Sequence, residues 1–232
     1  MTGERAIPPT RSKQALRWML RAGASESHSF KEICSCLTLS QKTLKEVDGA
    51  FRTVKREHFL PPHLLRYSED DVPLPIGYEQ TISQPTTVRL MLCWLDVEPG
   101  HKVLDVGSGS GWTTAMLAYL VGEKGRVFAT ERIPELKTFG ENNCKAQGFD
   151  NIEFHLTEDT LGLPEYAPYD RILVSAAAQQ KVPLDLLAQL AANGKMVIPE
   201  LFSVVEVKKN SVDEIDYRRE HYGFSFVPLI EP

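Results

Sequence analysis

Three closely spaced glycines, with acidic side chains before and after them, are the residues best placed to do chemistry in this chain. Val103–Trp112 reads Val-Leu-Asp-Val-Gly-Ser-Gly-Ser-Gly-Trp, so that the glycines are Gly107, Gly109 and Gly111. A glycine lets the backbone turn sharply and come close to a ligand, because it has no Cβ atom. An apolar run that leads into such a loop and then into a helical stretch predicts a cofactor site at the end of a buried strand.

The acidic residues around this loop favour one cofactor over another. Asp105 lies just before Gly107, where its carboxylate would repel a pyrophosphate at a helix N-terminus but attract the ammonium group of a methionine moiety. The nicotinamide fingerprint has its third glycine one position later, where this chain has Trp112. Glu131, at the end of the next apolar run, is suited to accept hydrogen bonds from ribose hydroxyls, which either cofactor offers. The pattern as a whole predicts S-adenosylmethionine as the cofactor.

The elements that must hold these residues alternate between short apolar strands and helical stretches from Lys102 onward. This alternation predicts an α/β fold with a doubly wound, mostly parallel, Rossmann-like sheet. The last two stretches alternate with polar residues, so we expect a C-terminal antiparallel strand pair. The predicted strands are 102–106, 126–130, 152–155, 171–175, 195–198, 203–208 and 221–227, and the predicted helices among them are 112–121, 134–147 and 183–192.

The region before the sheet has a different pattern, with apolar residues at helical spacing. The predicted helices there are 13–24, 29–38, 40–51 and 86–95. Ser40 is the expected N-cap of the third helix, and acidic residues and prolines predict a loop over residues 68–75. We therefore expect an N-terminal helical extension on the substrate side over residues 1–72, and a cofactor-binding domain over residues 73–232.

Composition and charge limit the classes of partner. The chain has 232 residues, 42% of them hydrophobic, and a net charge of −5, so neither nucleic acid nor a membrane is an expected partner. The start of the chain lacks the apolar core of a signal peptide, and no apolar run is long enough to span a bilayer, which predicts a cytoplasmic protein. Four cysteines without metal-binding spacing predict free thiols and no metal site. We expect a monomer by default.

A segment upstream of the glycine loop is more specific than any of these patterns. Leu74–Pro85 reads Leu-Pro-Ile-Gly-Tyr-Glu-Gln-Thr-Ile-Ser-Gln-Pro, and a generic cofactor-binding fold does not need it. It resembles the Pro-Ile-Gly…Gln-Thr-Ile-Ser-Gln-Pro signature of the protein-L-isoaspartate O-methyltransferase family. Leu161–Ala178 and Phe226–Leu229 resemble further segments of that family, and the likeness extends from about Phe51 to Leu229.

The resemblance implies an enzyme that transfers a methyl group from S-adenosylmethionine to the α-carboxyl group of isoaspartyl residues in damaged peptides and proteins, as a step in their repair. By its place in the family motif Ser83 is the active-site serine, although it could instead be the N-cap of the helix that begins near Thr86. No Gly-x-Ser-x-Gly elbow surrounds Ser83, so we expect it to orient the substrate carboxylate rather than attack it. The expected cofactor-binding residues are Thr81, Ile82, Asp105, Gly107, Ser108, Gly109, Gly111, Glu131, Glu158 and Asp159.

Some positions depart from the family pattern. Thr157-Glu158-Asp159 stands where the family usually has Gly-Asp-Gly, which makes Glu158 the expected partner of the adenine. Glu79 stands where a glycine is common, and Glu-Leu-Phe-Ser follows Pro199 where the family usually has a glycine-containing loop. Two alternatives therefore stay open: a carboxyl methyltransferase that acts on a dedicated peptide or protein partner, and a cofactor-binding adaptor without turnover.

Overall fold

The computed structural model describes residues 40–157 and 159–231 of the chain. The helices predicted over residues 13–24 and 29–38 lie outside this part, as does Glu158. Among the helices of the described part, none has the length and apolar character needed to cross a bilayer.

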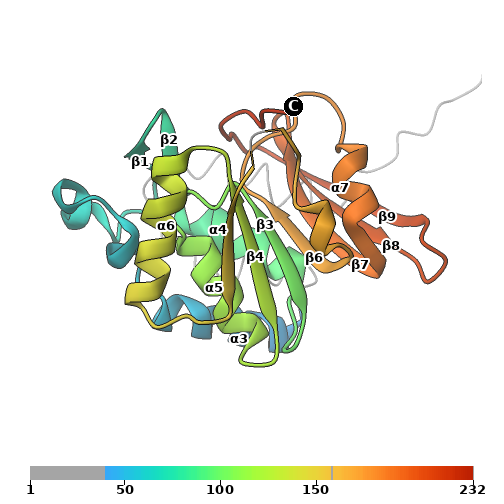
Figure 1. The fold of residues 1–232 in the computed structure, drawn as a ribbon, viewed down its shortest axis with the longest axis horizontal. Helices are drawn as coiled ribbons and strands as arrows, with labels where there is room; N and C mark the ends of the chain where they lie inside the picture. Colours follow the sequence, from blue (N-terminus) through green and yellow to red (C-terminus); the bar gives the residue numbers. More distant parts are fainter. Residues whose placement is uncertain (1–39, 158, 232) are drawn as a thin grey trace, which may run out of the picture.

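A seven-stranded sheet forms the centre of the protein (Figure 1). Its strands are β3 (Lys102–Val106), β4 (Arg126–Glu131), β5 (Ile152–Leu156), β6 (Tyr169–Val174), β7 (Leu190–Glu200), β8 (Ser203–Lys209) and β9 (Ile215–Tyr222). They are arranged in the order β5-β4-β3-β6-β7-β8-β9. The first five strands of this order are parallel to one another, and β8 and β9 are antiparallel to their neighbours. The predicted doubly wound, mostly parallel sheet with a C-terminal antiparallel pair is thus confirmed.

Helices cover both faces of this sheet (Figure 1). They are α4 (Pro85–Leu95), α5 (Trp112–Val121), α6 (Pro134–Ala146), α7 (Leu184–Gln189) and the short 3-10 helix η3 (Pro164–Tyr166). One hydrophobic core contains α4, α5 and α6, and a second core on the opposite face contains α7. Within β3, Val103 belongs to the first core and Leu104 and Val106 to the second, because successive side chains of a strand point to opposite faces.

The chain before the sheet packs on the first of these cores. It contains α3 (Gln41–Thr53), the 3-10 helices η1 (Arg56–Phe59) and η2 (Pro62–Tyr67), and the hairpin strands β1 (Leu74–Gly77) and β2 (Gln80–Ile82). The helix predicted over residues 40–51 is confirmed as α3, which contacts α4 and α5. Ser40 is its N-cap, as predicted, because Ser40 Oγ accepts a hydrogen bond from the Thr43 N–H group at 3.0 Å.

The loop predicted over residues 68–75 is wrong at its end, because β1 begins at Leu74. Leu74 and Ile76 are buried, and the strand pairs with β2 in an antiparallel hairpin too short to be recognised from its pattern. The turn residues Tyr78 and Glu79 have φ angles of 54° and 58°, a region that glycine adopts without steric cost. This conformation explains why a glycine is common at the position of Glu79 in the family that the segment resembles.

Two elements near the C-terminus are shifted from their predicted positions. The helix predicted over residues 183–192 is shorter, because Leu190 already pairs with Tyr169 as the first residue of β7. The strand predicted over residues 221–227 is instead β9, which pairs with β8 and ends before Gly223, where φ is 98°. Charged side chains along β9 suit an edge strand because they discourage pairing with another chain, and apolar periodicity alone therefore placed it too late.

Candidate active site

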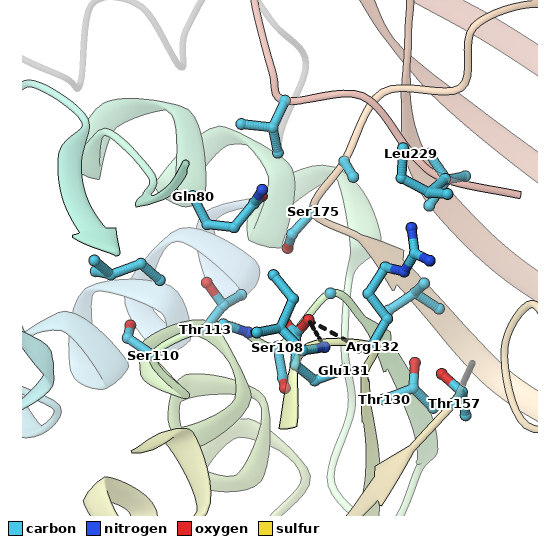
Figure 2. A pocket seen from close by; sticks show the side chains of 18 of the residues that line it. Gln80, Ser108, Ser110, Thr113, Thr130, Glu131, Arg132, Thr157, Ser175 and Leu229 are labelled. Atoms are coloured by element: carbon cyan, nitrogen blue, oxygen red, sulfur yellow. Dashed lines mark hydrogen bonds between the residues drawn. The ribbon is translucent and has the colours of Figure 1, made fainter. Parts of the chain in front are cut away.

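A cavity of about 360 Å³ opens at the carboxyl ends of β3, β4 and β6 (Figure 2). Its wall contains Val106 and Glu131, the last residues of β3 and β4, and Ser175, which follows β6. Ligands of open α/β sheets bind in the crevice outside the carboxyl ends of the strands. The cavity therefore lies where the order of the strands predicts a ligand site.

The three glycines of the loop make different contributions to this cavity. Gly107 and Gly109 line it, with φ angles of 81° and 52°. Gly111 does not line it; a Cβ atom there would lie 2.7 Å from the Gly140 carbonyl oxygen and 2.9 Å from Cys144 Sγ. The first two glycines thus expose the backbone to a ligand, whereas Gly111 lets α5 begin in close contact with α6.

Glu131 joins the glycine loop to the end of β4. Its Oε2 accepts a hydrogen bond from the Gly109 N–H group at 2.9 Å, and its Oε1 accepts from the N–H groups of Arg132 at 2.8 Å and Ile133 at 3.1 Å. The side chain is buried, yet it lines the cavity next to Ser108 (Figure 2). An ionised carboxylate has about four acceptor positions, so Glu131 can hold the loop and still accept hydrogen bonds from a ligand.

Asp105 lies beneath the loop and does not line the cavity. Its side chain is fully buried; Oδ2 accepts a hydrogen bond from Thr114 Oγ1 at 2.6 Å, and Oδ1 has no partner among the described residues. Burial raises the pKa of Asp105 to about 7, although the Thr114 hydrogen bond opposes this effect and the charge of Glu131 adds to it. Among the described residues, the Asp105 carboxylate is therefore bonded to α5 through Thr114 and does not reach the cavity.

The raised pKa of Asp105 predicts that this residue stabilises the unliganded protein at low pH, and that its contribution is lost as the pH rises from about 4 to about 7. In that window the folded protein keeps the Asp105 proton that the unfolded chain releases, so the contribution of Asp105 to the free energy of unfolding falls with pH and levels off above about 7. Asp105→Asn stays neutral in both states and keeps an acceptor for Thr114. Denaturant unfolding should show the variant gaining stability over the unsubstituted protein across this window, and a constant difference would contradict the assignment.

Thr81–Ser83 line the same cavity from the end of β2. The alternative prediction that Ser83 caps α4 is wrong, because Gln84 occupies the cap position and Asp71 Oδ1 accepts the hydrogen bond from the Thr86 N–H group at 2.8 Å. Ser83 Oγ makes no hydrogen bond to the described residues, and no histidine or carboxylate is paired with it there. The hydroxyl is therefore free to bind a ligand but is not activated as a nucleophile.

Three residues predicted to bind the cofactor remain: Ser108, Glu158 and Asp159. Ser108 lines the cavity, and its buried Oγ has no hydrogen-bond partner in the described part of the chain. Asp159 is exposed and does not line the cavity, whereas Thr157, which was not predicted to bind the cofactor, does. Glu158, between them, lies outside the described residues, so its contact with the adenine stays a prediction.

Residues 227–230 also line the cavity, a position that was not predicted from the sequence. The Ala177 N–H group donates to the Val227 carbonyl, and the Leu229 N–H group donates to the Ala177 carbonyl, both at 2.8 Å. The two segments that carried part of the family resemblance therefore run side by side, and that resemblance was the only signal for their role. Polar cavity residues not singled out from the sequence are Gln80, Ser110, Thr113, Thr130, Arg132, Thr160 and Ser175.

Comparisons with known proteins show the family of the chain. The family model for protein-L-isoaspartate(D-aspartate) O-methyltransferase matches residues 33–231. The chain is 42% identical over 191 residues to the protein-L-isoaspartate O-methyltransferase of Methanococcoides burtonii, covering 81% of this chain and 93% of that protein. It is 49% identical over 189 residues to the enzyme of that name from Methanopyrus kandleri, covering 79% of this chain and 83% of that protein.

Solved structures show the same fold. A protein-L-isoaspartate O-methyltransferase structure matches with a TM-score of 0.70 at 24% identity, over 94% of this chain and 65% of that one. A Plasmodium falciparum protein assigned to the same family, solved in complex with S-adenosyl-L-homocysteine, matches with a TM-score of 0.69 at 22% identity, over 97% of this chain and 100% of that one. From the family model and the sequence identities, the chain belongs to the protein-L-isoaspartate(D-aspartate) O-methyltransferase family.

Proposed function

We propose that this protein transfers a methyl group from S-adenosylmethionine to the α-carboxyl group of L-isoaspartyl residues in damaged peptides and proteins, which starts their repair. One observation carries the proposal. Ser83, from the segment specific to the family, and the glycine loop at Gly107 and Gly109 line one cavity, although they come from separate parts of the chain. A substrate group held at Ser83 would therefore meet a cofactor held at the loop.

The residues of the cavity fit this cofactor. Glu131 offers acceptor positions for ribose hydroxyls, and Ser108 offers a buried hydroxyl without a partner among the described residues. At Gly107 an added Cβ would have only the Ser175 Cβ nearby, at 3.9 Å, so the backbone there is open to close approach. We propose these three residues, with Gly109, Thr81 and Ile82, as the cofactor contacts. Gly111 would let the loop lie against α6, and Asp105 would hold the start of α5 through Thr114.

The chain has little chemistry to perform in such a reaction. The bound cofactor would supply a methyl group on a sulfonium, which is already activated for transfer. A substrate carboxylate, with a reference pKa near 4, is ionised at neutral pH and needs no general base. Ser83 would orient that carboxylate by donating a hydrogen bond, and the cavity would exclude water around it. Orientation of this kind can lower a barrier by roughly 7–11 kcal/mol.

Glu131→Gln is expected to raise the dissociation constant of S-adenosylhomocysteine about 10- to 100-fold, a loss of about 1.5–3 kcal/mol. The glutamine amide has one acceptor oxygen. Its NH₂ group would therefore face a backbone N–H group, of Gly109 or of Arg132, that now donates a hydrogen bond to the Glu131 carboxylate. Glu135→Gln is the matched control, because Glu135 is exposed and outside the cavity. Calorimetry should give an unchanged constant for the control, and an equally unchanged constant for Glu131→Gln would remove Glu131 from the cofactor site.

Conversion of a peptide tests the proposed repair. A synthetic isoaspartyl peptide incubated with the protein and S-adenosylmethionine should give the succinimide and then the aspartyl peptide, resolved by chromatography. Conversion only of a particular protein partner would favour the dedicated methyltransferase, and cofactor binding without any conversion would favour the adaptor.

The division into residues 1–72 and 73–232, a monomeric state and a cytoplasmic location stay predictions.

A further inference from the structure

Arg56 connects three separate segments next to the proposed substrate position. Its guanidinium group donates hydrogen bonds from Nη1 to the Asp70 carbonyl at 2.9 Å, and from Nη2 to the carbonyls of Val72 at 2.8 Å and Ser83 at 3.1 Å. Nη2 also lies 3.5 Å from the Ile82 carbonyl. These acceptors are backbone groups. The Arg56 side chain therefore fixes the backbone around Ser83 and not the side chains of that segment.

A buried cation in this position is costly unless its surroundings compensate. Arg56 is only 5% exposed, and its Nε has no partner among the described residues. Burial lowers the pKa of Arg56, and the nearby charges of Asp71, Asp70 and Glu69 oppose that effect. The guanidinium group also lies over the ring of Trp112, 5.4 Å from its centroid, a favourable contact for a cation.

Trp112 extends this connection to the cofactor side of the cavity. It is the first residue of α5, directly after the glycine loop, and it lines the cavity. Its Nε1 donates a hydrogen bond to the Val54 carbonyl at 3.1 Å, so the chain just before Arg56 is tied to the start of α5. Arg56 therefore lies between the two parts of the site that must be aligned.

The chain on the other side of Ser83 is held as well. Asp71 accepts hydrogen bonds at 2.8 Å from both the N–H group and the hydroxyl of Thr86, and one at 3.1 Å from the Gln84 side chain. Ser83 thus has its own carbonyl fixed by Arg56 and the helix after it fixed by Asp71, while its hydroxyl stays unpaired within the described part of the chain. Such an arrangement limits where that hydroxyl can point.

We propose that Arg56 is a positioning residue for methyl transfer: with Asp71, it fixes the backbone of Ser83 so that the serine hydroxyl meets the substrate carboxylate in line with the cofactor. The inference rests on the proposed function, because it assigns Arg56 a role that acts only through Ser83. A positioning role predicts something that a purely structural role of Arg56 does not. The effect of an Arg56 substitution on turnover must disappear when the serine hydroxyl is absent.

A double-mutant cycle on the full chain tests this dependence. Arg56→Lys keeps the positive charge, but a single ammonium cannot reproduce the fork that spans these carbonyls, so we expect kcat on an isoaspartyl peptide to fall about tenfold. In the Ser83→Ala background the same substitution should change kcat by less than about twofold. Affinity for S-adenosylhomocysteine should stay within a few-fold throughout. Arg66→Lys is the matched control and should leave kcat unchanged, because Arg66 is exposed and, among the described residues, contacts the ring of Tyr67 alone.

The outcomes distinguish failure of the proposed role of Arg56 from failure of the proposed function. A loss from Arg56→Lys that is equal in both backgrounds, or no loss at all, would overturn the role of Arg56 and leave the proposed function intact. Absence of methyl transfer by the unsubstituted protein would instead overturn the proposed function. If Arg56→Lys fails to fold, Asp71→Asn tests the other side of Ser83, and its effect on kcat must likewise disappear in the Ser83→Ala background.

Discussion

Replacing Ser83 by alanine is expected to slow methyl transfer to an isoaspartyl peptide by about 10²-fold, or roughly 2.7 kcal/mol of transition-state stabilisation. The serine lines the cavity but does not cap α4, so the substitution removes a hydroxyl without breaking a hydrogen bond to the described part of the protein. The affinity for S-adenosylhomocysteine should therefore stay within a few-fold, and the free energy of unfolding should change little. Steady-state kinetics, calorimetry and denaturant unfolding of the same preparation separate these effects.

Ser83→Cys supplies the chemical control for this prediction. Because the substrate carboxylate attacks the methyl group directly, neither the serine nor the cysteine should carry a methyl or acyl group during turnover. Mass spectrometry of the quenched reaction checks this point. Detection of modified Ser83, or full activity in Ser83→Ala, would show that the hydroxyl does not act by orienting the substrate.

Gly111→Ala is expected to destabilise the protein by about 2–5 kcal/mol, the sum of overpacking and left-handed backbone strain. The added Cβ would meet the Gly140 carbonyl oxygen at 2.7 Å and Cys144 Sγ at 2.9 Å, on a backbone with φ of 84°. Neither a backbone oxygen nor a buried thiol can move aside easily. Either α6 shifts away from the glycine loop or the loop distorts, so cofactor affinity should fall together with stability.

Gly148→Ala is the matched control, because Gly148 has φ of 77° but no atom within 4 Å of the added Cβ. It should cost only the left-handed strain, about 1–2 kcal/mol, and leave cofactor affinity unchanged. Denaturant unfolding of the two variants isolates the steric term. Equal losses in both would mean that α6 can move away from Gly111 without difficulty.

These contacts show which features of the site can be predicted from the sequence. The glycine loop and Glu131 are local signals tied to strand ends, and the order of the parallel strands brings them together. The different roles of the three glycines depend on the close approach of Gly140, in α6, to Gly111. A sequence pattern does not contain the distance between these two residues. The position of Asp105 just before Gly107 predicts a contact with the cofactor, whereas in the structure its side chain is fully buried and does not line the cavity.

Long-range backbone contacts were the least predictable part of the site. Arg56 does not lie in a recognisable motif. Its partners Asp70, Val72 and Ser83 accept hydrogen bonds through backbone carbonyl oxygens, which every residue type has. The C-terminal segment that ends with Leu229 likewise joins the cavity through backbone hydrogen bonds. Only resemblance to a family indicated that these stretches belong near the site.

The proposed activity can be measured as the initial rate of methyl transfer from labelled S-adenosylmethionine to an L-isoaspartyl peptide, with the aspartyl peptide of identical sequence as the control. We expect base-labile label in the isoaspartyl peptide only, and we expect this labelling to depend on Ser83. Equal labelling of both peptides, or no labelling of either while the cofactor binds normally, would contradict it.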